Sequence, residues 1–308
     1  MKKYFTEEGH LYFDDVDLDI NQGKPPQKSK YISGTRFVHA FAGEFHRDYW
    51  LFYKGLKEIN PGLAKMFMNA EDFSTQFRSH FIEINMEEKV LSASDLVSVY
   101  EHMHTLKGEW EKERDRSANQ GSAFHLVKEE ESLSLGGAHC HFDDKFYEIP
   151  KSYYEAKEKF KYTNESFVDD LSQLEPGYYP ELIVWFDYNN FRFIGQADKV
   201  FVTDRKSFFM DDFKTNKAIK TKGFYSKKNR SYQMMKGPCS HMHDCNLNHY
   251  KCQLNFYSFG LNQHGLTPEG LMISHHKNYD TINFTPYVFD IDLGMIKEML
   301  DHYTNGLV

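Results

Sequence analysis

The segment from Leu182 to Lys214 constrains the fold more than any other part of the chain. A short apolar run over 182–186 ends at a turn over 187–190. Two further runs, 191–202 and 208–214, are typical of strands joined by a turn over 203–207. Helical periodicity precedes this segment and returns after it. Strands with helices on both sides predict an α/β domain with a mixed central β-sheet flanked by helices.

The chain before this segment is predicted to be mostly helical. The first thirty residues are polar and irregular, and helical spacing begins after Ser33. Apolar residues then follow one helical face: Phe37, Val38, Phe41, Phe45, Tyr49 and Phe52. The sequence at 60–62, Asn-Pro-Gly, ends that helix, and a further helix or pair of helices is expected to about residue 84.

Three more helices are expected before the strands. Ser94 is suited to cap a helix over 92–113, and 121–131 and 153–174 are further helical candidates. After the strands, the pattern predicts a helix over 249–260, short strands at 271–274 and 287–291, and a closing helix at 293–303. We therefore expect a helical N-terminal region over 1–115 and an α/β core over 116–308.

Composition limits the class of protein. The chain of 308 residues has 27 Phe, 20 Tyr and 3 Trp with a formal net charge of −8. This aromatic content excludes a disordered tail protein, and the negative charge argues against a wholly basic nucleic-acid coat. Four cysteines, no long apolar run and no signal-peptide pattern predict a soluble cytoplasmic protein without a membrane partner.

Charged side chains gather at the ends of the two strands that the turn over 203–207 joins. Asp212 and Lys214 are two residues apart in a strand, so they face one side, while Asp211 faces the other. If the strands pair about the turn, Asp198 lies near Asp212. Two carboxylates and an ammonium would then share a pocket that suits Mg²⁺ or Mn²⁺ and a metal-activated water. A surface ion pair on an edge strand is the structural alternative.

Four motifs in this region resemble the PD-(D/E)XK nuclease superfamily, and within it the RecB-like, exonuclease-type group. That group carries G-x-x-x-H, then G-x-x-D, then D-[FY]-K-T and finally Q-x-x-x-Y. The corresponding segments here, in the same order, are Gly121–His125, Gly195–Asp198, Asp212–Thr215 and Gln253–Tyr257. Each motif alone is weak, and their order and spacing make the set specific. The resemblance covers roughly 120–275 and says little about 1–115.

The resemblance implies a restriction-endonuclease-like core and a role for each matching residue. The metal ligands it implies, for one or two Mg²⁺ or Mn²⁺ ions, are His125, Asp198, Asp212 and the main-chain carbonyl of Phe213. Lys214 would act on the attacking water or on the charge that develops on the phosphate. Gln253 and Tyr257 would orient the scissile strand, although ordinary helix packing is their alternative. Glu181 is expected only to support the ligands from outside.

A basic strip follows the proposed catalytic lysine. From Phe213 to Lys236 the chain has eight basic residues and no acidic one. Phosphate attraction combined with aromatic stacking is how proteins hold a nucleic-acid strand. The nucleic-acid-binding residues predicted from this strip are Lys217, Lys220, Lys222, Phe224, Tyr225, Lys227, Lys228, Arg230 and Tyr232. A flexible, solvated lysine loop is the alternative.

A group of cysteines and histidines lies between 239 and 252. Cys239, Cys245 and Cys252 precede Gln253, and none is spaced C-x-x-C. RecB-like nucleases with an iron–sulfur cluster carry one cysteine upstream of the motifs and three downstream. Cys140 does not match that upstream position. The spacing therefore argues against structural zinc or an iron–sulfur cluster, and favours incidental thiols.

These patterns predict a divalent-metal-dependent deoxyribonuclease. We expect an exonuclease that acts on DNA ends or single strands and hydrolyses phosphodiester bonds with a metal-activated water. One alternative is a catalytically silent, nuclease-fold protein of a phage or mobile element that binds DNA or has a structural role in the host cytoplasm. Another is a zinc hydrolase built on histidine pairs such as His241 and His243. The complete Asp–Asp–Lys set speaks against the silent protein.

Overall fold

The structure is a computed structural model that describes residues 3–6, 11–14, 17, 20, 30–163 and 170–308. The chain forms two compact units. Unit 1 comprises residues Met1–Ala42, Gly121–Lys222 and Met234–Val308, and unit 2 comprises Gly43–Gln120 and Gly223–Gln233. This division differs from the expected one at residue 115. Residues before 43 supply a strand and a helix to the α/β unit, and the segment 223–233 belongs to the helical unit.

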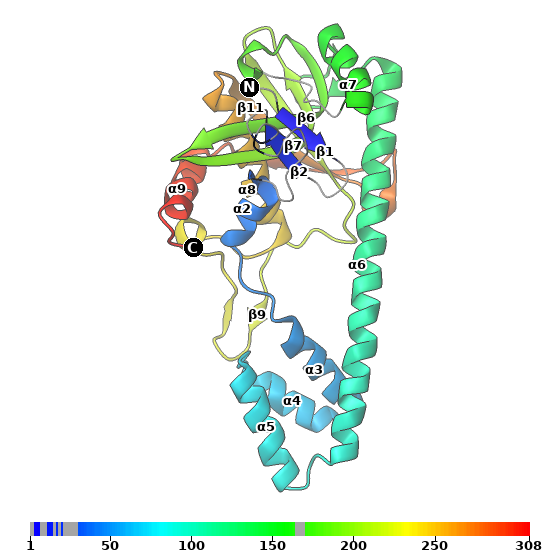
Figure 1. Ribbon diagram of the computed structural model, residues 1–308, viewed down its shortest axis with the longest axis vertical. Coiled ribbons are helices and arrows are strands. Elements are labelled where there is room, and N and C mark those ends of the chain that lie inside the picture. The colour runs from blue at the N-terminus through cyan, green and yellow to red at the C-terminus, as the bar shows by residue number, and fades with distance from the viewer. Residues whose placement is uncertain (1–2, 7–10, 15–16, 18–19, 21–29, 164–169) are drawn as a thin grey trace. The chain divides into compact units, whose positions relative to one another are not determined.

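Unit 1 is built on a six-stranded mixed sheet (Figure 1). Its strands are β3 (Ile32–Ser33), β6 (Gly177–Tyr188), β7 (Phe191–Val202), β8 (Ser207–Lys214), β11 (Thr267–His275) and β12 (Thr285–Phe289). The strand order is β12-β11-β8-β7-β3, with β6 also paired to β7. β7 is antiparallel to both β6 and β8, whereas β8 and β11 are parallel. The predicted α/β class with a mixed sheet flanked by helices is confirmed.

Helices of unit 1 cover this sheet. They are α2 (Gly34–Ala40), the last part of α6 (Ala93–Leu135), α7 (Lys151–Thr163), α8 (Asn246–Gln263) and α9 (Leu293–Thr304). The short helices η1 (Leu171–Gln173), η2 (Gly237–Cys239) and η3 (Lys277–Tyr279) also belong to this unit. Of the helix expected over 153–174, the residues 164–169 lie outside the described part of the chain.

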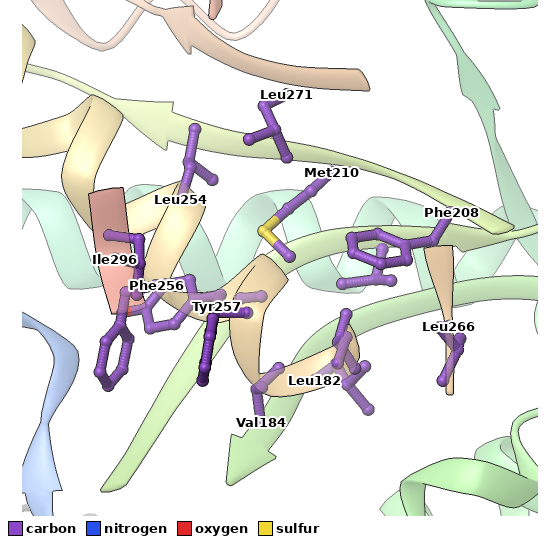
Figure 2. Packing of buried hydrophobic residues seen from close by; sticks show 14 of the residues in the cluster. Leu182, Val184, Phe208, Met210, Leu254, Phe256, Tyr257, Leu266, Leu271 and Ile296 are labelled. Atoms are coloured by element: carbon purple, nitrogen blue, oxygen red, sulfur yellow. The ribbon is translucent and has the colours of Figure 1, made fainter. Parts of the chain in front are cut away.

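The core of unit 1 lies between α8 and the sheet. Figure 2 shows Leu182 and Val184 of β6 and Met210 of β8 grouped with Phe256 of α8. Every residue of α8 from Leu254 to Leu261 is buried, so this helix is enclosed on several sides. The helix buries polar residues such as Asn255 and Ser258 together with apolar ones, which explains why its amphipathic pattern in the sequence is weak.

Two small antiparallel pairs complete unit 1. They are β1 (Lys3–Thr6) with β2 (Leu11–Asp14), and β4 (Gly137–Cys140) with β5 (Lys145–Glu148). The prediction that the first thirty residues are irregular is therefore wrong over β1 and β2. The strand signal that was missed is the pair of adjacent aromatic residues in each strand, Tyr4–Phe5 and Tyr12–Phe13, because aromatic residues are enriched in strands.

Unit 2 contains helices and one hairpin. The helices are α3 (Arg47–Ile59), α4 (Pro61–Ala70), α5 (Thr75–Glu87) and the first part of α6, and the hairpin joins β9 (Tyr225–Ser226) to β10 (Ser231–Tyr232). After residue 60 we expected one helix or a pair, and the structure has the pair α4 and α5. Asn60 Oδ1 accepts a hydrogen bond from Leu63 N at 3.0 Å and Pro61 opens α4, so the same residues end one helix and start the next.

Two helix predictions need correction. The single helix expected from Ser33 to about residue 60 is two helices, α2 and α3, because Phe41 packs in the core of unit 1 and Tyr49 in that of unit 2. Helical spacing cannot distinguish one core from two. Conversely, the segments at 92–113 and 121–131 form one helix, α6, and its capping residue is Ser92 rather than Ser94. Ser92 Oγ accepts from Asp95 N at 3.1 Å, and the Asp95 carboxylate accepts from Ser92 N at 3.0 Å.

No helix among the described residues combines the length and the apolar character that crossing a membrane requires.

Candidate metal site

Five elements of unit 1 bring polar side chains to one cavity of about 660 Å³. The cavity lies where α6, β6, β7, β8 and α8 converge. The site residues that line it are His125 of α6, Glu181 of β6, Asp198 of β7, Asp212 and Lys214 of β8, and Gln253 and Tyr257 of α8. Side chains separated by more than a hundred residues in the sequence thus meet in one cavity. A simple surface ion pair between Asp212 and Lys214 would not explain this convergence.

The β7–β8 hairpin brings the first two carboxylates together. Its register pairs Lys199 with Asp211, so Asp198 and Asp212 lie at adjacent positions of neighbouring strands. Asp198 Oδ2 accepts a hydrogen bond from Phe213 N at 2.6 Å, which fixes the carboxylate against the next strand. Both carboxylates are almost fully buried.

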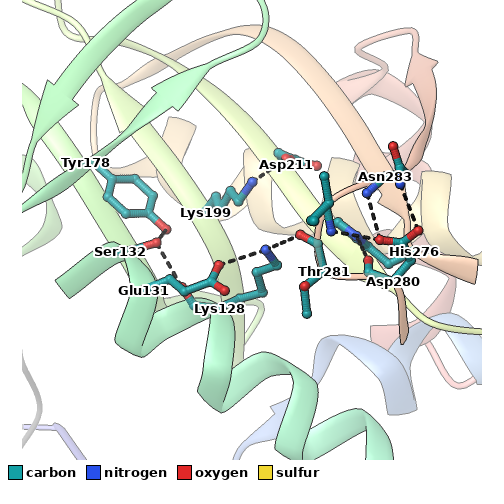
Figure 3. A network of polar contacts seen from close by, with 11 residues as sticks. Lys128, Glu131, Ser132, Tyr178, Lys199, Asp211, His276, Asp280, Thr281 and Asn283 are labelled. Atoms are coloured by element: carbon teal, nitrogen blue, oxygen red, sulfur yellow. Dashed lines mark hydrogen bonds and ion pairs between the residues drawn. The ribbon is translucent and has the colours of Figure 1, made fainter. Parts of the chain in front are cut away.

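Asp211 points to the opposite side of the sheet, as strand alternation predicts. Figure 3 shows its carboxylate beside the Lys199 ammonium, at 3.0 Å. Ser274 Oγ lies 2.9 and 3.0 Å from its two oxygens. Asp211 therefore has its own partners away from the cavity and supports the sheet rather than the site.

His125, Glu181 and Asp198 form the group that could hold a metal ion. One ligand atom from each lies within 4.8 Å of the others. His125 Nδ1 is 3.5 Å from Glu181 Oε1 and 3.4 Å from Asp198 Oδ1. Glu181 therefore takes a place in the ligand set that we expected it to support only from outside. Asp212 is not part of this group, and its role as a ligand stays a prediction, as does that of the Phe213 carbonyl.

The register of the β6–β7 hairpin explains the position of Glu181. Pro180 pairs with Lys199 and Leu182 with Ala197, which places Glu181 opposite Asp198. The two-residue turn at Asn189 and Asn190 sets this register, with φ of 47° and 64°. Glu181 itself has a φ of 54°, a left-handed conformation that is uncommon for a residue other than glycine.

The electrostatics of these three residues favour a cation. The Asp198 carboxylate raises the pKa of His125 to about 11, against the opposing effect of burial. Burial, followed by the Asp198 charge, raises the pKa of Glu181. Burial also acts to raise the pKa of Asp198, but His125 outweighs it and the net shift is downward. The carboxylates thus keep a proton on His125, and a metal ion bound to that imidazole would have to displace it.

Asp212 and Lys214 form an ion pair beside this group. Burial and the Asp198 charge raise the pKa of Asp212 to about 7, although Lys214 opposes the shift. Burial acts to lower the pKa of Lys214, but Asp212 and Asp198 outweigh it and the net shift is upward. The ammonium also lies 4.9 Å from the centre of the Tyr250 ring. Asp212 Oδ2 is buried and is the oxygen that pairs with the Lys214 ammonium.

Tyr257 packs against two glycines at the back of the cavity. A Cβ at Gly195 would lie 2.8 Å from Tyr257 Cζ, and one at Gly34 would lie 2.7 Å from Tyr257 Cε1. Gln253 Nε2 donates to Tyr257 Oη at 2.7 Å. The glycine of the G-x-x-D motif is therefore required for the close approach of helix α8 to strand β7.

The predicted basic strip is divided between the two units. Lys217, Lys220 and Lys222 belong to unit 1, whereas the segment from Phe224 to Tyr232 belongs to unit 2. Lys228 Nζ donates to Ala70 O at 2.8 Å, so this lysine contributes to docking the hairpin within unit 2. Nucleic-acid binding by the strip stays a prediction.

All four cysteines are buried and free of disulfides. The thiols of Cys239 and Cys252 form a hydrogen bond with each other, which lowers the pKa of Cys239 and raises that of Cys252. Within the described residues, the one group of three potential metal ligands is His125, Glu181 and Asp198.

Comparisons with known proteins provide no function. No family model and no curated protein matches this chain. A solved structure described as "Crystal structure of SSO0001" aligns with 95% of this chain and 82% of its own, at 11% identity and a TM-score of 0.32. A likeness at that TM-score carries no argument about fold or function.

Proposed function

We propose that this protein is a divalent-metal-dependent deoxyribonuclease with a restriction-endonuclease-like core. The observation that carries the proposal is the meeting of His125, Glu181, Asp198, Asp212 and Lys214 in a single cavity. Perturbed ionisable groups that converge in a cleft are typical of catalytic sites. The order of the four motifs along the chain, which resembles the RecB-like group, supports the same reading.

The residues present fit a divalent ion. His125, Glu181 and Asp198 would hold it. Asp212, whose Oδ2 pairs with the Lys214 ammonium, would be a further ligand through its other oxygen. A site rich in carboxylate oxygen suits Mg²⁺ or Mn²⁺. When bound, such an ion polarises a phosphoryl oxygen and makes a coordinated water more acidic.

The remaining residues position the substrate and balance charge. Lys214 stays protonated, and its pairing with Asp212 holds the ammonium in the cavity, where it would compensate the negative charge that develops on the phosphate. Gln253 and Tyr257 line the same cavity and would orient the scissile strand through their amide and hydroxyl groups. Asp198 is held by the Phe213 amide, so it requires little rearrangement before it acts.

We propose DNA ends or single strands as the substrate. Lys217, Lys220 and Lys222 lie within the eight residues that follow Lys214 and belong to the same unit as the cavity. Basic side chains next to a phosphodiester-cleaving site would hold the backbone of a strand.

The test uses linear duplex, circular duplex and single-stranded DNA with Mg²⁺, Mn²⁺ or EDTA. We expect metal-dependent cleavage that requires ends or single strands. Asp198→Asn and Lys214→Ala should each lower the rate by about 10²- to 10³-fold, the loss typical of removing one group that stabilises a transition state. Lys145→Ala, an exposed lysine of β5, is the matched control and should cut as wild type does.

Two results would contradict the proposal. Cleavage that persists in EDTA would exclude the metal mechanism. Cleavage by Lys214→Ala at the wild-type rate would exclude the catalytic role of that ammonium. Tight DNA binding with no cleavage in either metal would instead favour a catalytically silent nuclease fold.

A further inference from the structure

A second cavity lies wholly within unit 2 and is separate from the metal site. It has a volume of about 300 Å³, at the small end of the range of about 300–1,000 Å³ for ligand pockets. Six aromatic rings dominate its lining: Tyr49, Trp50, Tyr53, Phe73, Phe224 and Tyr225. A pocket of this size with aromatic walls fits one planar ring system better than a large ligand.

Helices α3 and α4 form one side of this pocket, and the β9–β10 hairpin forms the other. Glu71 joins the two sides: its carboxylate accepts hydrogen bonds from Ser226 Oγ and, at 3.1 Å, from Lys228 N. Lys228 Nζ adds a bond to Ala70 O. These contacts hold the hairpin against the end of α4, so the pocket exists before any ligand binds.

The rings of the hairpin are open to solvent. Phe224 is 48% exposed and Tyr225 is 45% exposed. The Phe224 ring centre lies 5.7 Å from that of Trp50, at an interplanar angle of 75°. In edge-to-face packing the edge of one ring meets one face of the other, and the remaining ring faces stay available. Exposed aromatic faces in a concave site are stacking platforms for bases.

The charge around the pocket selects an anionic chain. Lys227 lines the pocket and is exposed, and the segment Gly223–Gln233 of the same unit contains no acidic residue. Glu71 is the acid in the lining, but its oxygens are already engaged, and the Ser226 hydroxyl lowers its pKa more than any other contact. An aromatic cage for a cationic ligand would instead need a carboxylate that is free to face the ligand.

We propose that this pocket binds one unpaired base of a single DNA strand, with Lys227 contacting the adjoining phosphate. This inference deepens the proposed function and rests on it for the choice of DNA. It assigns a role to Trp50, Tyr53 and Phe73, which no sequence motif singled out. Asn69, which is exposed in the lining, supplies an amide that can bond to the edge of the base.

The experiment measures binding of labelled oligothymidylate to the full-length protein by fluorescence anisotropy, in EDTA so that no cleavage is needed. Phe224→Ala and Tyr225→Ala should each weaken binding roughly 5- to 150-fold, the range for loss of one stacked base. Tyr100→Ala is the matched control, because Tyr100 is a 46% exposed tyrosine of unit 2 outside the pocket. Phe224→Leu keeps an apolar side chain beside Trp50 and should also weaken binding, which separates stacking from folding.

An abasic oligomer of the same length distinguishes base from backbone. Wild type should prefer oligothymidylate, and Phe224→Ala should lose that preference. Equal binding of the two oligomers by wild type, or unchanged binding by Phe224→Ala, would overturn the proposal. Quenching of tryptophan fluorescence by tetramethylammonium, lost in Trp50→Phe, would show a cation cage instead and would also overturn it. Because the assay contains no metal, its outcome is independent of whether the protein cleaves DNA.

Discussion

Replacing Gly195 with alanine should damage the candidate site through packing alone. The added Cβ would stand 2.8 Å from Tyr257 Cζ and 3.0 Å from Cδ1, and closer still to Cε1. Carbon atoms in contact prefer separations of about 3.5–4.0 Å. The ring cannot move away freely, because Tyr257 is 3% exposed, Gly34 bounds it as well, and its hydroxyl is bonded to Gln253.

The overlap sets the expected size of the effect. Overpacking a well-filled core costs about 1–3 kcal/mol, and an overlap of this depth against a confined ring places Gly195→Ala at about 3 kcal/mol. For a domain of roughly 150–250 residues, each kcal/mol corresponds to a change of about 2–4 °C in Tm. Calorimetry of the metal-free protein should therefore show the transition of unit 1 lowered by about 6–12 °C.

Gly121→Ala is the matched control. Gly121 lies in α6 within unit 1, and its Cβ would meet Thr215 Oγ1 at 3.9 Å, an ordinary contact. Replacing a helical glycine by alanine there should stabilise the unit by about 0.5–1 kcal/mol. Gly195→Ala in a Tyr257→Leu background should cost less than in wild type, since the clashing ring is gone. A Tm for Gly195→Ala within about 1 °C of wild type would refute this reasoning.

Three further predictions concern the metal, the sheet and the hairpin. Mn²⁺ at roughly 100 times its dissociation constant should raise the free energy of unfolding by about 2.7 kcal/mol, and Asp198→Asn should abolish the gain. An unchanged free energy of unfolding in wild type would argue against a metal site. Asp211→Asn should cost about 3 kcal/mol in urea unfolding, at the low end for a broken buried pair because the Lys199 side chain keeps 13% exposure; an unchanged midpoint would contradict this. The folded pKa of Glu71 is lowered from 4.5, chiefly by Ser226, so the docking of the hairpin is stabilised above that value and weakens as pH falls through the folded pKa. Hydrogen exchange at the Lys228 amide should become faster relative to its intrinsic rate below about pH 4.5, and Glu71→Gln should lack that step.

The two strands that carry Asp198 and Asp212, β7 and β8, could be predicted from the sequence because each carries a local signal. The pattern over 191–202 matches β7 at both ends, and β8 begins one residue before the predicted strand. The helical region was harder, because the apolar stripe from Phe37 to Phe52 serves two separate cores. A separate helix was expected to begin at Gly121, yet α6 continues through that residue. Helical spacing reports a buried face and carries no information about which core buries it.

In the candidate site, too, the residues that depend on a local pattern were predicted, and the one that depends on pairing between strands was not. The D-F-K-T motif and strand alternation were sufficient to bring Asp212 and Lys214 to one side and to send Asp211 to the other. Glu181 was undervalued because its proximity to Asp198 depends on the register of a hairpin, and motif spacing does not encode register. The signal was nevertheless present in the sequence. Asn189-Asn190 favours a two-residue turn, and counting outward from that turn pairs residue 181 with residue 198. A carboxylate directly opposite a predicted metal ligand in an antiparallel pair lies close enough to share that metal, so hairpin register should be counted before such a residue is assigned a supporting role.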